Sequence, residues 1–240
     1  MIQHRCYSQV IVRDGVSFHD SLAQTWEAGY EGDTFSIRLR VLSSLLAKGN
    51  PGQHWLDAGC GTGTLSRWLA RERSFSVVAI DASERMLANA SPEEGVEYRR
   101  ADVIKTGLPE CSFDGVLCSS VLEYLPSVEA ALREFHRVLK PSGTLVASVP
   151  NSALSVRIPM KIVCWLTRRL GRKRWYAFLD YSKHCYSATG FSEVLRFCGF
   201  SAERMIEFGV LELPLGIRVR AGTGTLIMAL AKRTSSDQHH

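Results

Sequence analysis

A glycine-rich turn between an apolar strand and a helix constrains this chain more than any other segment. Residues 54–65 read HWLDAGCGTGTL, an apolar run followed by three glycines and then by apolar residues at helical spacing. We expect Thr64 to cap the helix. Glycine tolerates positive φ and lets a ligand approach the backbone, and a helix N-terminus presents unpaired N–H groups and a positive dipole end. The turn therefore predicts a binding site for a ligand that carries an anionic group or many hydrogen-bond acceptors.

The spacing of the glycines narrows the choice of ligand. Gly59, Gly61 and Gly63 follow the pattern G-x-G-x-G, whereas a dinucleotide site has G-x-G-x-x-G/A and a phosphate-cradling loop ends in Gly-Lys-Ser/Thr. Asp57 precedes the first glycine by two residues. This acid would repel a pyrophosphate but suits a ligand with an ammonium or sulfonium charge. The pattern therefore favours S-adenosylmethionine over a nicotinamide dinucleotide.

Five segments, in order along the chain, resemble the class I S-adenosylmethionine-dependent methyltransferases. Residues 56–63 resemble the glycine-rich motif I of that family. Residues 77–81 form a short apolar run that ends in an acid about twenty residues after the glycine loop. Residues 101–103 resemble the stretch that contacts adenine. Residues 113–118 resemble the fourth strand, and residues 139–145 resemble the turn into the fifth strand. The resemblance covers roughly residues 18–232.

Strand and helix patterns alternate through most of the chain, which predicts an α/β fold with a Rossmann-like, doubly wound sheet. Strands are expected near residues 54–58, 76–80, 96–100, 113–118, 143–149, 201–208 and 223–231. Helices are expected near residues 64–72, 83–90, 127–139 and 189–198. The resemblance implies seven mostly parallel strands with an antiparallel C-terminal hairpin, N-terminal helices, and a helical insertion after the fifth strand. We expect one methyltransferase domain over residues 1–240, with an N-terminal helical cap at residues 18–50.

The resemblance also implies which residues bind the donor. Asp57 would hold the amino group of the methionine moiety, Asp81 the ribose hydroxyls and Asp102 the amino group of adenine. Asp81 could instead only cap the helix that follows it. The other expected donor contacts are Tyr30, Gly59, Gly61, Gly63, Ala82, Met86, Val103 and Ser119. The acids follow predicted strands, so we expect them to converge in one crevice beyond the carboxyl ends of the sheet.

The acceptor side of the site has a motif that is only partly kept. Methyl transfer from a sulfonium is an in-line displacement, in which the enzyme aligns the acceptor and removes a proton from a hydroxyl acceptor. Residues 118–126 resemble the segment of ubiquinone-biosynthesis O-methyltransferases that carries E-x-x-E-H. Only Glu123 remains of that motif, because Ser120 and Tyr124 occupy the other two positions. We therefore expect no metal site and keep Glu123 as a candidate catalytic residue.

Two histidines are candidates for the base that removes the acceptor's proton. His184 lies just before the last predicted helix, where the chain of the resembled family passes over the acceptor pocket. His19 is the second candidate, on the N-terminal helix that closes over the donor in that family. Histidine suits this role because it titrates near neutral pH. His184 could instead be a loop histidine that is bonded to the backbone, and His19 is the weaker candidate of the two.

The insertion at residues 151–187 carries a basic amphipathic helix. No acid occurs between Glu134 and Asp180. The cations of the insertion are Arg157, Lys161, Arg168, Arg169, Arg172, Lys173 and Arg174. Its apolar helical face consists of Ile158, Ile162, Trp165 and Leu166. Pro159 is expected in the first helical turn. Residues 157–174 could contact a membrane surface, or the insertion could be a soluble lid or a partner-binding face. Nucleic acid is a less favoured partner, because the chain carries no recognisable module for it.

These patterns predict a cytoplasmic methyltransferase that can associate with membranes. Seven scattered cysteines without a C-x-x-C pair are typical of reduced thiols, and no apolar run is long enough to span a bilayer. The expected reaction is O-methylation of a small hydrophobic molecule, such as a quinone precursor, a phenolic or polyketide natural product, or a lipid-like intermediate. The alternatives are a methyltransferase that acts on tRNA or protein through the basic insertion, and a non-catalytic donor-binding scaffold. The sequence does not predict the oligomeric state.

Overall fold

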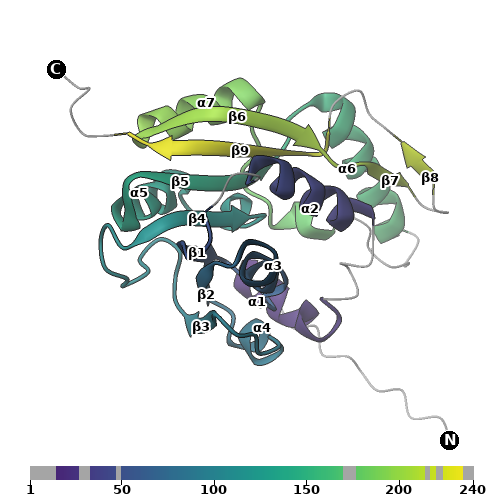
Figure 1. Ribbon diagram of the computed structural model, residues 1–240. Helices are drawn as coiled ribbons and strands as arrows, with labels where there is room; N and C mark the ends of the chain where they lie inside the picture. Colours follow the sequence, from purple (N-terminus) through teal and green to yellow (C-terminus); the bar gives the residue numbers. More distant parts are fainter. Residues whose placement is uncertain are drawn as a thin grey trace, which may run out of the picture.

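Seven strands form one mixed sheet in the order β3-β2-β1-β4-β5-β9-β6 (Figure 1). The computed structural model describes residues 15–26, 33–46, 50–169, 177–213, 217–219 and 224–234. The strands of this sheet are β1 (His54–Ala58), β2 (Ser76–Asp81), β3 (Val96–Arg100), β4 (Phe113–Ser119), β5 (Leu139–Pro150), β6 (Phe200–Phe208) and β9 (Leu226–Arg233). Strands β7 (Leu211–Leu213) and β8 (Ile217–Val219) pair separately.

The direction of the strands confirms the expected architecture. Strands β1 to β5 run parallel, and β9 runs antiparallel to both β5 and β6. Strand β1 lies between β2 and β4, so the order of strands reverses next to it. In open α/β sheets the ligand crevice lies at such a reversal, beyond the carboxyl ends of the strands. The sheet therefore places the ends of β1, β2 and β4 around one site.

Helices cover both faces of this sheet (Figure 1). They are α1 (Gly15–Leu22), α2 (Asp33–Leu45), α3 (Thr64–Arg73), α4 (Glu84–Ala88), α5 (Val128–Val138), α6 (Leu154–Arg169) and α7 (Ala188–Phe197), with short 3-10 turns η1 (Ala23–Thr25), η3 (Leu122–Tyr124) and η4 (Ala177–Asp180). Leu56 and Val116 belong to a buried cluster with α5 and α7, whereas Trp55 and Leu117 belong to one with α2 and α3. Neighbouring strand residues thus serve opposite cores, as a sheet buried on both faces requires.

Two expectations about helix starts are wrong. Helix α3 begins at Thr64 itself, and Gly63 occupies the capping position with a φ of 78° and no side-chain hydrogen bond. Helix α6 begins at Leu154, so Pro159 lies inside it and not in its first turn. The earlier start has a local cause, because Asn151 Oδ1 accepts a hydrogen bond from the Ala153 N–H at 3.0 Å. Pro159 has no N–H to donate to the carbonyl of Ser155, four residues earlier in α6. Because Ser155 is exposed, α6 tolerates the proline.

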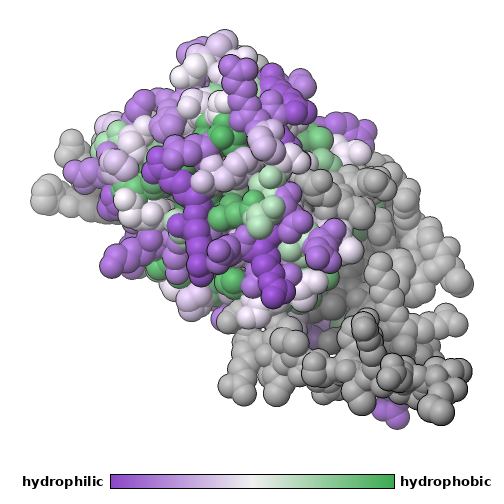
Figure 2. Space-filling model, turned by 90° about the horizontal axis from the view of Figure 1, so that it is seen from below, coloured by the Kyte–Doolittle hydropathy of each residue, from purple (hydrophilic) through white to green (hydrophobic). Residues whose placement is uncertain are grey.

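The surface mixes polar and apolar side chains. On the face seen from below in Figure 2, hydrophobic residues show between hydrophilic ones. No helix within the described part of the chain is long and apolar enough to cross a membrane. The six described cysteines are all free thiols: Cys60, Cys111, Cys118, Cys164, Cys185 and Cys198.

Candidate active site

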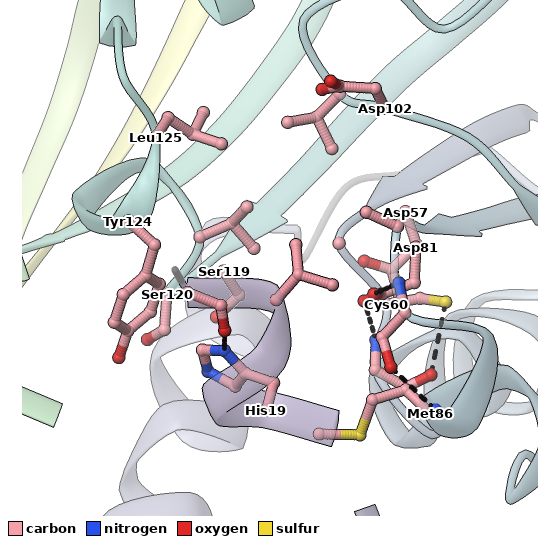
Figure 3. A pocket seen from close by; sticks show the side chains of 18 of the residues that line it. His19, Asp57, Cys60, Asp81, Met86, Asp102, Ser119, Ser120, Tyr124 and Leu125 are labelled. Carbon is pink, nitrogen blue, oxygen red and sulfur yellow. Dashed lines mark hydrogen bonds between the residues drawn. The ribbon is translucent and has the colours of Figure 1, made fainter. Parts of the chain in front are cut away.

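A cavity of about 370 Å³ lies beyond the carboxyl ends of β1, β2 and β4. Nine of the predicted donor-binding residues line it: Asp57, Gly59, Gly61, Asp81, Ala82, Met86, Asp102, Val103 and Ser119. Gly63 does not belong to the lining, and Tyr30 lies outside the described residues. In Figure 3 the acids Asp57 and Asp81 face the cavity from one side, and Ser119, Ser120, Tyr124 and Leu125 lie on the other. Nine residues named from the sequence thus surround one cavity.

Asp57 is the most deeply buried acid of the cavity. It is the fourth residue of β1, and its side chain accepts a hydrogen bond from Ser66 Oγ at 2.6 Å. Burial raises the pKa of Asp57 to about 7, and the nearby charge of Asp81 adds to this rise, while the Ser66 bond opposes it. An ionised Asp57 is thus costly unless a positive charge sits beside it. The site favours a cationic ligand at this point.

Asp81 orders the glycine loop as well as lining the cavity. Its two carboxylate oxygens accept hydrogen bonds from the N–H groups of Gly61 and Ser83, each at 2.8 Å. Ser83 Oγ, and not Asp81, caps α4 by accepting from the Met86 N–H. Burial raises the pKa of Asp81. Each carboxylate oxygen has a second lone pair, so Asp81 can also accept from the hydroxyls of a sugar.

Two glycines of the loop are required by their surroundings. Gly59 has a φ of 80°, and a Cβ there would overlap the side chain of Val121 on the opposite wall. Gly63 has a φ of 78°, and a Cβ there would overlap the ring of Tyr98. Gly59 therefore lets the two walls of the cavity approach each other. Gly63 serves the packing of the loop against β3 and does not face the ligand space.

Sequence reasoning missed several residues of the cavity, of which Arg38, Trp26 and Lys183 matter most. All three line the cavity, and Arg38 donates from Nη2 to Ser120 Oγ at 2.9 Å. Arg38 comes from α2, far from the glycine loop in sequence. No spacing rule connects these positions to the cavity, so only the packed structure could reveal them.

His19 reaches the cavity from α1. Its Nδ1 lies 2.6 Å from the carbonyl oxygen of Gly15 (Figure 3). A carbonyl only accepts, so Nδ1 carries the proton of the ring and Nε2 is left as the acceptor nitrogen. Burial lowers the pKa of His19, so the ring is neutral at pH 7. Its ring packs edge-on against Trp26 and Tyr124, with centroid distances of 5.3 and 4.7 Å.

The other two candidate catalytic residues lie outside the cavity lining. His184 Nε2 is 3.0 Å from the carbonyl oxygen of Leu125, which ties the ring to the backbone behind the cavity wall. Glu123 is buried, and its Oε2 has no hydrogen-bond partner. Burial raises the pKa of Glu123 to about 7, while the charges of Arg38 and Arg157 oppose the rise. The structure thus brings His19 to the cavity and leaves His184 and Glu123 outside its lining.

Helix α1 spans the cavity and is fixed at both sides. Asp20 accepts a hydrogen bond from Ser83 Oγ at the start of α4. Phe18 stacks on Tyr181 with a centroid distance of 4.4 Å and an interplanar angle of 22°. These two contacts place His19 between the acids Asp57 and Asp81 of β1 and β2 and the segment after β4. The helix closes the cavity from the side opposite the strand ends.

The lining fits the ligand that the sequence predicts. Asp57 provides a negative charge for an ammonium or sulfonium group, and Arg38 provides a positive charge for a carboxylate. Ser119 Oγ is buried without a hydrogen-bond partner and can bond a polar group of a ligand. The methionine moiety of S-adenosylmethionine carries an ammonium group, a sulfonium group and a carboxylate. Among the described residues, no group of three or more His, Cys, Asp or Glu side chains could hold a metal ion.

Comparison with known proteins also indicates a methyltransferase domain. A family model described as a methyltransferase domain matches residues 56–147. The chain is 35% identical over 180 residues to the ubiquinone biosynthesis O-methyltransferase of Hahella chejuensis, covering 69% of this chain and 74% of that protein. It is 36% identical over 124 residues to the malonyl-[acyl-carrier protein] O-methyltransferase of Serratia marcescens, covering 50% of this chain and 48% of that protein, so it spans only about half of this relative.

The similarity to solved structures extends over most of the chain, as one example shows. The crystal structure of an S-adenosylmethionine-dependent methyltransferase from Mesorhizobium loti superposes with a TM-score of 0.59 at 27% identity. The match covers 81% of this chain and 96% of that chain. The similarity therefore extends well beyond the glycine loop and includes the elements that surround the cavity.

Proposed function

The chain belongs to the class I S-adenosylmethionine-dependent methyltransferases, near the ubiquinone-biosynthesis O-methyltransferases, and we propose that it methylates an oxygen of a small, hydrophobic acceptor. S-adenosylmethionine is its co-substrate. The observation that carries the proposal is His19, a neutral imidazole with an available acceptor nitrogen on the cavity wall. Such a group can take the proton from a hydroxyl that is being methylated.

In this proposal the donor is held by charge and by the backbone of the glycine loop. Asp57 holds its ammonium group, Arg38 its carboxylate and Asp81 its ribose hydroxyls. Asp102 lies at an exposed position of the lining and accepts from adenine, and the buried Met86 packs beside that base. When bound, the donor supplies a methyl group already activated on a sulfonium. The residues of the chain therefore need to orient and deprotonate the acceptor.

The acceptor side of the cavity is mostly apolar. Val16, Val121, Leu125 and Pro126 line it, and Tyr124 contributes to the same lining. Burial raises the pKa of Tyr124 far above its usual value, so its hydroxyl keeps its proton at pH 7 and Tyr124 does not serve as a base. These surfaces suit a phenol, a hydroxyquinone or a similar molecule. Removal of its proton by Nε2 of His19 raises the nucleophilicity of the oxygen.

A second candidate acceptor is a carboxylate. Lys183 lies at the rim of the cavity and could hold an acceptor's negative charge. One relative is named as a malonyl-[acyl-carrier protein] O-methyltransferase. A carboxylate is already ionised at pH 7 and needs no base. The two candidates thus differ in their need for His19.

The proposal is tested by binding and turnover with defined compounds. We expect S-adenosylhomocysteine to bind in a calorimeter and S-adenosylmethionine to be consumed with hydroxylated aromatic acceptors. The panel would include phenols, hydroxyquinones, carboxylic acids, amines and bulk tRNA. Turnover with amines or tRNA alone would overturn the proposal. Donor binding without turnover on any acceptor class, including a protein extract, would favour a scaffold.

A further inference from the structure

Helix α6 has one buried face and one exposed apolar face. Val156, Met160, Val163, Cys164 and Thr167 are buried against the rest of the protein. On the other side, four large apolar side chains are exposed: Ile158 (50%), Ile162 (51%), Trp165 (57%) and Leu166 (44%). Their spacing of four, three and one residues places them on one face of the helix, about 100° wide. We refer to these four residues as the α6 stripe.

The α6 stripe is unusual for this molecule. It holds four of the six large hydrophobic residues that are exposed in the described part of the chain. The other two, Val16 and Phe197, are isolated, at the cavity and on α7. Scattered apolar side chains on a surface are ordinary, but a contiguous apolar patch marks a contact site. The helix therefore has a face for which the described residues provide no cover.

The charged side chains of α6 itself are all positive. Lys161, Arg168 and Arg169 are exposed on α6, and the guanidinium of Arg169 lies 5.5 Å from the ring centroid of Trp165. No acid occurs in the sequence between Glu134 and Asp180. Arg157 is not part of this surface, since it is half-buried and lowers the pKa of Glu123. A partner of this face must therefore be apolar at its centre and negatively charged around it.

We propose that the α6 stripe docks on the surface of an anionic lipid bilayer. The helix would lie in the plane of the interface, with the stripe among the upper acyl chains and Lys161, Arg168 and Arg169 on lipid phosphates. A cationic helix with Trp and aliphatic residues on one side is the composition of interfacial helices. At 1.5 Å per residue, its sixteen residues form a rod about 24 Å long.

A second copy of the chain fits this surface less well. Four half-exposed side chains present roughly 400 Å², about half of what one partner buries in a standard protein interface. A symmetric dimer through this face would also bring its cations close to their copies, which opposes association. Lipid headgroups satisfy those cations, and the bilayer needs no complementary shape. The lipid surface is thus the occupant that both the apolar and the charged parts favour.

The position of α6 connects docking with the cavity. The helix follows the carboxyl end of β5, the same edge of the sheet at which the cavity lies (Figure 1). Docking would hold the enzyme close to a store of hydrophobic molecules. The docking proposal itself does not depend on the identity of the acceptor, so it can fail or hold separately from the proposed function.

Vesicle co-sedimentation tests the docking. We expect the protein to bind vesicles of phosphatidylcholine and phosphatidylglycerol, and to bind pure phosphatidylcholine at least tenfold more weakly. Trp165→Glu should weaken binding about tenfold or more, and neutralisation of Lys161, Arg168 and Arg169 to Gln should remove its salt dependence. Phe197→Glu is the matched control. Phe197 is also an exposed aromatic with an arginine nearby, Arg133 at 5.6 Å, and its replacement should leave binding unchanged.

Three outcomes would overturn the docking. One is failure of the unmodified protein to bind anionic vesicles, and another is equal loss with Trp165→Glu and Phe197→Glu. The third is that Trp165→Glu leaves vesicle binding unchanged but abolishes another complex. That complex would be a dimer seen in sedimentation velocity or a complex with tRNA. Calorimetry with S-adenosylhomocysteine should give the same affinity for all variants. This shows that they are folded and separates loss of docking from loss of the donor site.

Discussion

Apart from Arg38 and Ser119, the donor wall of the cavity comes from one stretch of chain, residues 57–104, whereas the acceptor wall is assembled from α1, residues 120–126 and Lys183. In the donor wall, Asp57 and Asp81 are fixed by hydrogen bonds to Ser66, Gly61 and Ser83, all within twenty residues of them in sequence. In the acceptor wall, His19 is placed by contacts of α1 with distant segments. The donor wall is therefore built by local turns, and the acceptor wall by tertiary packing. A family can keep one and change the other.

The sharpest test of this contrast is the loss of the proposed base on the acceptor wall. His19→Ala should lower kcat with a hydroxyl acceptor by about 10²–10⁴-fold, because general base catalysis is worth that much. The affinity for S-adenosylhomocysteine should change little. Steady-state kinetics with the best acceptor of the panel, and calorimetry, measure the two effects.

His184→Ala is the matched comparison for His19→Ala. The His184 ring lies outside the cavity lining and bonds to the Leu125 carbonyl, so we expect a loss of kcat below about fivefold, within the 0.5–1.5 kcal/mol of one hydrogen bond. A larger loss with His184→Ala than with His19→Ala would reverse the assignment of the base. Equal rates for His19→Ala and the unmodified enzyme would favour a carboxylate acceptor.

The next largest effect tests how closely the donor wall and the acceptor wall of the cavity approach each other at Gly59. Gly59→Ala would drive a Cβ into Val121 at positive φ. We expect a loss of about 2–4 kcal/mol in the free energy of unfolding, and donor binding weakened roughly 100-fold. Gly52→Ala is the control, because Gly52 has the same φ of 80° and nothing within 4 Å of the added Cβ. It should cost only about 1 kcal/mol and leave donor binding intact. Equal losses would show that backbone strain alone accounts for Gly59.

We expect Arg38 to contribute to donor binding, although it lies far from the glycine loop in the sequence. Arg38→Met removes the cation proposed to hold the donor's carboxylate, and the affinity for S-adenosylhomocysteine should fall roughly 10–100-fold, since a charge-assisted hydrogen bond is worth about 1.5–3 kcal/mol. Arg40→Met, an exposed position of the same helix, should have no effect. Calorimetry of both variants decides whether α2 belongs to the donor site.

The features that could be predicted from the sequence are those that a local sequence pattern determines. The strands and the positions of Asp57, Asp81 and Asp102 follow from alternation and from the glycine pattern, because parallel strands end at one edge. The cavity positions of Arg38 and Lys183 could not be foreseen, since no local rule links them to the glycine loop. The start of α6 was also missed, because the turn at Asn151 gives only a weak signal beside Pro159.

The smallest effect tests the electrostatics of the donor wall. Burial raises the pKa of Asp57 to about 7, and only the ionised carboxylate attracts the donor's ammonium group. Binding should therefore weaken as pH falls through 7, with the affinity for S-adenosylhomocysteine about tenfold lower at pH 6 than at pH 8. Binding at pH 7 should also release a proton from Asp57, which calorimetry detects as a dependence of the heat on the buffer.

Two variants separate Asp57 from the other titratable groups of the cavity. Asp81 and His19 also face it, and burial raises the pKa of Asp81 while it lowers that of His19. Asp57→Asn should bind more weakly and lose most of the pH dependence, whereas Asp102→Asn, at an exposed position, should keep it. A pH dependence that persists in Asp57→Asn would assign the proton to Asp81. Protonation of Asp81 would then also act on the glycine loop, because Asp81 accepts a hydrogen bond from the Gly61 N–H.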